Sequence, residues 1–225
     1  MEKKRDIKVF IEQLTKPRVE ALFSELFDEY ANKGIDKKQF AVKLLTGELE
    51  GIMDDYVDAF MGKTALTITD MDTNQLNSKV ISKVKLTYFS VEDLSYFISD
   101  IVEAMESVSE EYSKLFAVLT AIGYNYQNKG FILPNLLYVD DITLNSSSEN
   151  DIDAVIDSIF AVAANTVPKI RTDRIMIACC PDNEAVRQIM NDRFFMSVGV
   201  SGLMLRIIDL QDIEHYDNFP RKVEK

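Results

Sequence analysis

Residues 131–144 read Phe-Ile-Leu-Pro-Asn-Leu-Leu-Tyr-Val-Asp-Asp-Ile-Thr-Leu, and this stretch decides the fold. Its apolar run predicts a buried strand, and Pro134 predicts either a bulge or a division into two strands, because proline cannot donate to a strand ladder. Asp140 and Asp141 lie inside the run. Since side chains alternate along a strand, we expect these two to point to opposite faces. Ser148 follows as the cap of a predicted amphipathic helix, so a strand passes directly into a helix.

The same alternation of strand and helix extends to both sides of this stretch. Apolar runs predict further strands, and serine or aspartate caps with apolar spacing of three to four residues predict helices between them. The predicted strands cover residues 80–89, 174–180 and 202–210, and the predicted helices begin at residues 90, 148 and 182. This order predicts an α/β (α+β) fold with a mixed central sheet flanked by helices.

The first part of the chain has a different pattern. Apolar residues spaced three to four apart, with breaks at Gly34 and Gly47, predict short helices preceding the sheet. We therefore expect a helical segment at residues 1–65, a linker at 66–78, an α/β domain at 79–215 and a tail at 216–225.

Composition limits the function. The chain has 225 residues and a formal net charge of −12, which repels phosphate backbones and disfavours nucleic acid as a partner. No apolar run approaches the roughly 20 residues of a membrane span, and no secretory leader is expected. The two cysteines, Cys179 and Cys180, are adjacent and poorly placed for a mutual disulfide, which favours a reducing, cytoplasmic location.

Residues 79–211 resemble the GNAT family of N-acetyltransferases. Leu136–Leu144 is similar to that family's central strand, Ile175–Val186 to its next strand and the helix start that contains Asn183, and Leu86–Leu94 to its opening strand and helix. The resemblance implies a GNAT-like fold and acetyl-CoA or another acyl-CoA as cofactor. The residues it places at the cofactor are Ile142, Thr143, Leu144, Ser146, Ser147, Ser148 and Asn183.

The sequence departs from that pattern at two positions. The pyrophosphate loop of the family is rich in glycine, whereas residues 145–151 contain neither glycine nor a cation. The family's general-acid tyrosine is replaced by Met190, seven residues beyond Asn183, and a thioether cannot donate a proton. Asp140 and Asp141 are candidates for a general base, with solvated strand-end carboxylates as the alternative reading. No metal site is expected.

Two functions fit these observations. The first is a divergent acyl-CoA-dependent N-acyltransferase-like protein whose activity is altered or lost. The alternative is a non-catalytic, acidic protein-binding or regulatory module with the same fold. A protein partner or a homo-oligomer is compatible with both.

Overall fold

The computed structural model describes residues 6–46, 48–49, 55–72, 77–91, 94, 100–121, 135–166, 174–198, 202–209 and 223–224. Its strands and helices are, in chain order, β1 (Asp6–Leu14), α1 (Val19–Ala31), α2 (Lys37–Leu45), the 3-10 helix η1 (Val57–Phe60), β2 (Met61–Asp72), β3 (Asn77–Phe89), α5 (Ile101–Glu106), α6 (Glu110–Ala121), β4 (Asn135–Leu144), α7 (Glu149–Thr166), β5 (Arg174–Cys179), α8 (Glu184–Asp192), β6 (Met196–Val198), β7 (Leu203–Asp209) and β8 (Val223–Glu224).

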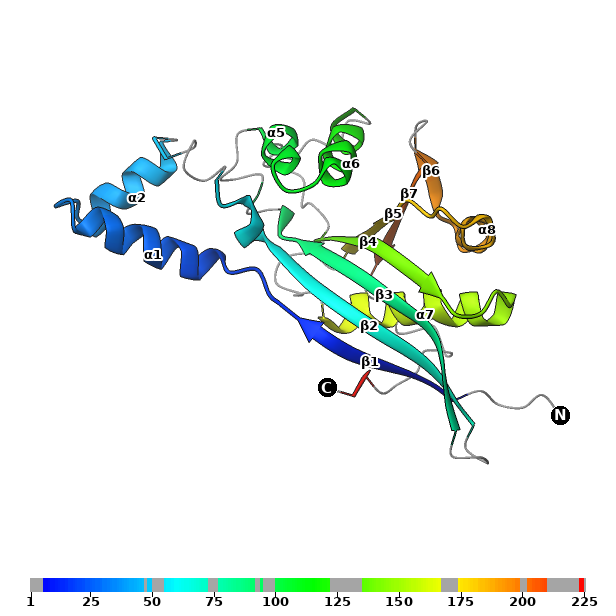
Figure 1. Cartoon of the computed structure of the whole chain (residues 1–225). Coiled ribbons are helices and arrows are strands. Elements are labelled where there is room, and N and C mark those ends of the chain that lie inside the picture. The colour runs from blue at the N-terminus through cyan, green and yellow to red at the C-terminus, as the bar shows by residue number, and fades with distance from the viewer. Residues whose placement is uncertain are drawn as a thin grey trace. The chain divides into compact units, whose positions relative to one another are not determined.

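The strands form one mixed sheet in the order β6-β7-β5-β4-β3-β2-β1-β8 (Figure 1). β4 and β5 pair in parallel, whereas β5 with β7, β6 with β7 and β1 with β2 pair antiparallel. This arrangement confirms the expected α+β class. None of the described helices is long and apolar enough to cross a membrane.

Contacts divide the chain into two compact units. The sheet unit comprises residues 1–15, 63–88 and 134–225, and the helical unit comprises residues 16–62 and 89–133. The expected domain boundaries at residues 65, 78 and 215 stay a prediction.

The N-terminal part of the chain contains more strand than its helical pattern indicated. α1 and α2 lie where helices were expected, and Asp36 caps α2 by accepting from the amides of Lys38 and Gln39. However, β1 precedes them and was not predicted. Its residues Ile7, Val9 and Ile11 face the core of the sheet unit, and Lys8 and the exposed Phe10 lie between them. This is the period-two burial of a half-buried strand.

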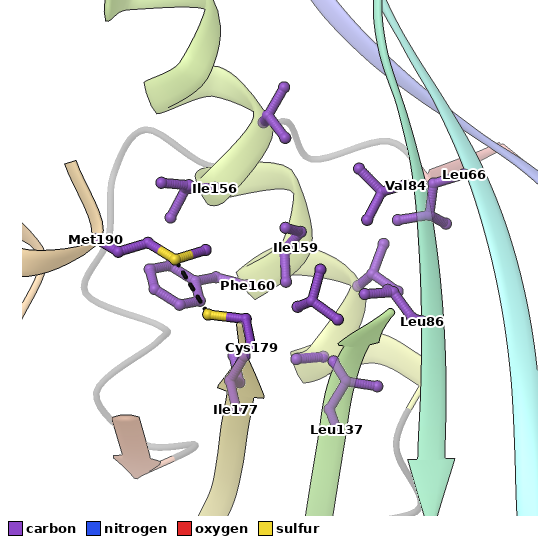
Figure 2. Close-up of a cluster of buried hydrophobic side chains, with 14 of the residues drawn as sticks. Leu66, Val84, Leu86, Leu137, Ile156, Ile159, Phe160, Ile177, Cys179 and Met190 are labelled. Carbon is purple, nitrogen blue, oxygen red and sulfur yellow. Dashed lines mark hydrogen bonds between the residues drawn. The ribbon is translucent and has the colours of Figure 1, made fainter. Parts of the chain in front are cut away.

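The core of the sheet unit lies between α7 and one face of the sheet. Ile156, Ile159 and Phe160 of α7 pack against side chains from the neighbouring strands, and the cluster extends to Met190 of α8 (Figure 2). α7 is the crossover that a parallel strand pair requires, so its apolar face is buried on the two strands it connects.

The helical unit has its own aromatic packing. The ring of Phe89 meets Tyr112 and Phe116 of α6 edge to face, at centroid distances of 5.0 and 5.3 Å. Phe40 of α2 packs in a similar way on Phe27 of α1. Aromatic side chains of α1, α2 and α6 therefore pack within this unit.

An ion-pair cluster links α7 to the end of α8. Arg193 donates to Asp153 and Asp157 at 2.8 and 2.9 Å. Burial lowers the pKa of Arg193, but the two carboxylates outweigh this effect and the net direction is upward. Burial raises the pKa of Asp157 above its ordinary value, with Arg193 opposing the rise. Arg193 therefore stays charged, while ionised Asp157 carries a desolvation penalty.

This penalty predicts a pH dependence. From the ordinary aspartate value of 3.8 up to its raised pKa, Asp157 binds more protons in the folded than in the unfolded chain. The contribution of Asp157 to the free energy of unfolding therefore falls as pH rises through that window. Urea unfolding across the acidic range should show that the wild type loses stability relative to Asp157→Asn as pH increases.

Glu110 offers a control of opposite sign. The hydrogen bond and charge of Lys114 lower its pKa, so its contribution is lost as pH falls. Wild type should therefore gain stability relative to Glu110→Gln as pH rises. Identical slopes for the two variants would contradict the assignment for Asp157.

Candidate functional site

The pairing of β4 with β5 ends before β4 does. The parallel pairing begins with Asn135 opposite Ile175 and ends with Val139 opposite Cys179. β4 then continues to Leu144. β5 stops at Cys179, and the chain turns through Pro181 into α8. The last five residues of β4 therefore extend past the final pair of the described β4–β5 ladder.

The other side of β4 is paired with β3. The Asn145 amide donates to the Ile81 carbonyl at 2.9 Å, and the Ser82 hydroxyl donates to the Thr143 carbonyl at 3.0 Å. Tyr88, near the end of β3, donates to Asn135 at the start of β4, so the two strands are antiparallel.

Main-chain groups alternate sides along such a strand. Because residues 143 and 145 turn toward β3, Ile142 and Leu144 direct their N–H and C=O groups to the side where the β5 register has ended. We call these groups of Ile142 and Leu144 the β4 edge.

The two aspartates of β4 share a face, contrary to expectation. Leu137 and Val139 belong to the core cluster beneath α7, and Ile142 and Leu144 also pack against it. Strict alternation would place Val139 and Ile142 on opposite faces, so the strand has an irregularity between them. Asp140 and Asp141 therefore both lie off the core face. The prediction that they point to opposite faces was wrong because it assumed a regular strand.

The surroundings of the two carboxylates differ. Asp140 is half-buried and accepts a hydrogen bond of 2.8 Å from the Thr87 hydroxyl on β3. Asp141 is exposed and accepts from the Thr143 hydroxyl at 3.0 Å. Asp140 is therefore held in place from a buried residue of the neighbouring strand.

In the predicted pyrophosphate loop, serine hydroxyls accept hydrogen bonds from main-chain amides of the same segment. The Ser148 hydroxyl accepts from the Asp151 amide at 3.2 Å, and the Ser146 hydroxyl accepts from the Ser148 amide at 3.4 Å. Glu149 and Asp151 occupy the first turn of α7. The two hydroxyls satisfy the amides of Ser148 and Asp151, and the two carboxylates offset the helix dipole, so this helix end disfavours a phosphate.

Asn183 and Met190 serve the structure of α8. The Asn183 side chain caps the helix by accepting from the amides of Ala185 and Val186. Met190 is buried, and its Sδ lies 3.1 Å from the Sγ of Cys179 (Figure 2). Burial raises the pKa of the Cys179 thiol far above its ordinary value. Neither sulfur is placed to exchange protons with a ligand.

The structure thus gathers part of the predicted site. Asp140 to Leu144, Thr143 included, lie together on β4. Ser148 and Asn183 instead cap helices, Ser146 accepts from the Ser148 amide, and Ser147 is exposed. Thr87 was not identified from the sequence. Its hydrogen bond to Asp140 depends on which strand lies beside β4, and no local sequence pattern predicts that neighbour. Among the described residues, no group of three or more His, Cys, Asp or Glu side chains could hold a metal ion.

Comparison of the chain with known families, curated proteins and solved structures identifies no family to which it belongs. No protein-family model matches the chain, and no curated protein is significantly similar to it. A crystal structure of a mutant of KacT aligns with 91% of this chain and 99% of its own, at 11% identity and a TM-score of 0.37. A likeness of that size carries no argument about fold or function.

These findings correct the family assignment made from the sequence. The assignment to the GNAT family was wrong: no protein-family model matches the chain, and the KacT structure is too dissimilar to support membership. The stretches that suggested it consist of a buried strand, a capped helix and a second buried strand. That succession satisfies the packing rules of many α/β proteins and does not identify one.

The Thr87–Asp140 contact can be tested by a double-mutant cycle. Thr87→Val, Asp140→Ala and the double variant should give a coupling energy of about 1–2 kcal/mol in the free energy of unfolding, because a hydrogen bond to a carboxylate from a buried hydroxyl is among the stronger ones. The exposed pair Asp141–Thr143 supplies the matched control. Its cycle should give about 0–0.5 kcal/mol, because water replaces the lost partner. Equal coupling in both cycles would remove the distinction between the two aspartates.

Proposed function

We propose that the chain binds an acyl-CoA along the β4 edge and transfers the acyl group to an amine. The observation that carries the proposal is the direction of the Ile142 and Leu144 main chain, which turns away from β3 beyond the last β4–β5 pair. The pantetheine arm of CoA contains two amide groups in an extended chain. Such a chain can add to a strand edge through main-chain hydrogen bonds.

The carboxylates supply the other half of the reaction. The amine nitrogen attacks the thioester carbonyl, the C–S bond breaks and the CoA thiolate leaves. Asp140, positioned by Thr87, or the exposed Asp141 takes the proton released by the amine. Met190 cannot protonate the thiolate, which leaves as the anion or takes its proton from water.

Location forms part of the same proposal. Acyl-CoA chemistry and two free cysteines, one of them buried, both fit the cytoplasm.

The β4 edge can be tested by removing one of its donors. Leu144→Pro deletes an N–H that faces away from β3, whereas Leu144→Val keeps the N–H and loses a comparable amount of side chain. With acetyl-CoA at about 100 times its dissociation constant, wild type and Leu144→Val should gain about 2.7 kcal/mol in unfolding free energy. Leu144→Pro should gain much less while unfolding normally without ligand. An equal gain in both variants would exclude the β4 edge as the binding site.

The occupied end of α7 makes a second prediction. Because Ser148, Glu149 and Asp151 disfavour a pyrophosphate there, the nucleotide end of CoA should contribute little to binding. S-acetyl-pantetheine should therefore bind within about tenfold of acetyl-CoA by calorimetry, a difference of about 1.4 kcal/mol. Much tighter binding of acetyl-CoA would show that the phosphates are held after all.

A non-catalytic binding module is the second candidate. The specific observation in its favour is that Ser148, Asn183 and Met190 all have structural partners at positions where a transferase would use them. This candidate predicts no thermal shift with acetyl-CoA or with S-acetyl-pantetheine, and no acylation of a panel of primary amines.

A further inference from the structure

Lys85 of β3 lies directly opposite the irregularity in β4. Residues that oppose each other on neighbouring strands share a face of the sheet, so the core-facing residues of β3 and β4 match in order. The Asn145 amide, which donates to the Ile81 carbonyl, anchors this order at the end of β4. The matched core-facing residues are Leu86 with Val139, Val84 with Ile142 and Ile81 with Leu144.

Two residues of β4 therefore oppose one residue of β3. Between their matched neighbours, β4 contains Asp140 and Asp141, whereas β3 contains Lys85 alone, which is the arrangement of a β-bulge. The hydrogen bond from Thr87 to Asp140 agrees with this register, because Thr87 lies two residues from Lys85 and on the same face. Lys85 thus shares the face off the core with both carboxylates.

The amine of Lys85 is available to this face. Its side chain is exposed, and within the described part of the chain its ammonium group has neither an ion pair nor a hydrogen bond. Lys83, two residues earlier on β3, is directed away from β4. Its Nζ lies 3.8 Å from the carboxylate of Glu12 on β1, so it reaches across β2 (Figure 1).

The spacing of the strands brings the Lys85 amine within reach of a ligand on the β4 edge. Such a ligand lies one strand spacing beyond β4, which is about 10 Å, or two spacings, from the backbone of β3. The four-carbon stem of Lys85 covers most of this distance along the face that carries Asp140 and Asp141. The two carboxylates then lie between the lysine and the ligand.

We propose that Lys85 is an acceptor of the acyl group, so that the chain acylates itself at this residue. The proposal rests on the proposed function, since it needs an acyl-CoA on the β4 edge. Lys85 reacts as its neutral amine. The nitrogen attacks the thioester carbonyl, an amide C–N bond forms and the C–S bond breaks. Asp140 or Asp141 accepts the proton that the nitrogen loses, and CoA leaves as the thiolate.

Incubation of the full chain with acetyl-CoA, followed by intact-mass measurement and peptide mapping, tests the proposal. Lys85 should be acetylated at least about tenfold faster than Lys83, because its amine is held beside the base and the thioester. Lys85→Arg keeps the positive charge and should abolish the fast incorporation. Lys83→Arg is the matched control on the same strand and should leave it unchanged.

The two aspartates and the protein concentration give further readouts. Asp140→Asn combined with Asp141→Asn keeps side-chain oxygens that can accept from Thr87 but removes the base, so Lys85 should then be labelled no faster than Lys83. The rate per chain should not change when the protein is diluted, because the transfer occurs within one chain. A rate that rises in proportion to protein concentration would overturn the proposal.

Failure of this proposal can be distinguished from failure of the proposed function. A chain that acetyl-CoA stabilises against unfolding, and that acylates an added primary amine while Lys85 is labelled no faster than Lys83, overturns self-acylation alone. A chain that acetyl-CoA neither stabilises nor labels overturns both.

Discussion

The parallel pairing of β4 with β5 is the interaction on which the sheet unit depends. Two parallel neighbours require a crossover, and α7 supplies it, so the apolar face of this helix becomes the core. The same pairing stops at Val139 and Cys179, because the chain after β5 turns into α8. The same pairing therefore accounts for both the core and the β4 edge. Where the two strands pair, α7 packs on them. Beyond the last pair, Ile142 and Leu144 direct their main-chain groups away from β3.

Polar groups of the sheet unit fall into two kinds. Some complete the fold: Ser148 and Asn183 cap helices, and Arg193 holds α7 to the end of α8. Others, Asp140 and Asp141, are brought onto one face by the irregularity in β4. A helix end that is already capped and acidic offers little to a phosphate, whereas strand amides and two carboxylates suit an extended amide chain and an amine. This contrast is why the proposed function relies on the strand and not on the helix.

Much of the fold could be predicted from local pattern. The strand ending at Leu144, the cap at Ser148 and the apolar face of α7 all depend on residues close in sequence, and the structure places them as expected. β1 was missed because its short alternation was outweighed by the stronger helical spacing that follows it. The family assignment failed for a related reason, since strand, cap and helix recur in unrelated α/β proteins and only the missing loop glycines would have been specific.

The sequence by itself determined the class of the fold, the position of its central strand and helix, and an acidic chain with two free cysteines. These follow from periodicity and charge, which are local or additive properties. Tertiary structure alone decided that Asp140 and Asp141 share a face, that Thr87 holds Asp140, and that Met190 lies against Cys179. Each of these depends on where a strand bulges or on which distant strand lies beside it. Pairings between residues far apart in the chain produce no periodic pattern in the sequence from which they could be predicted.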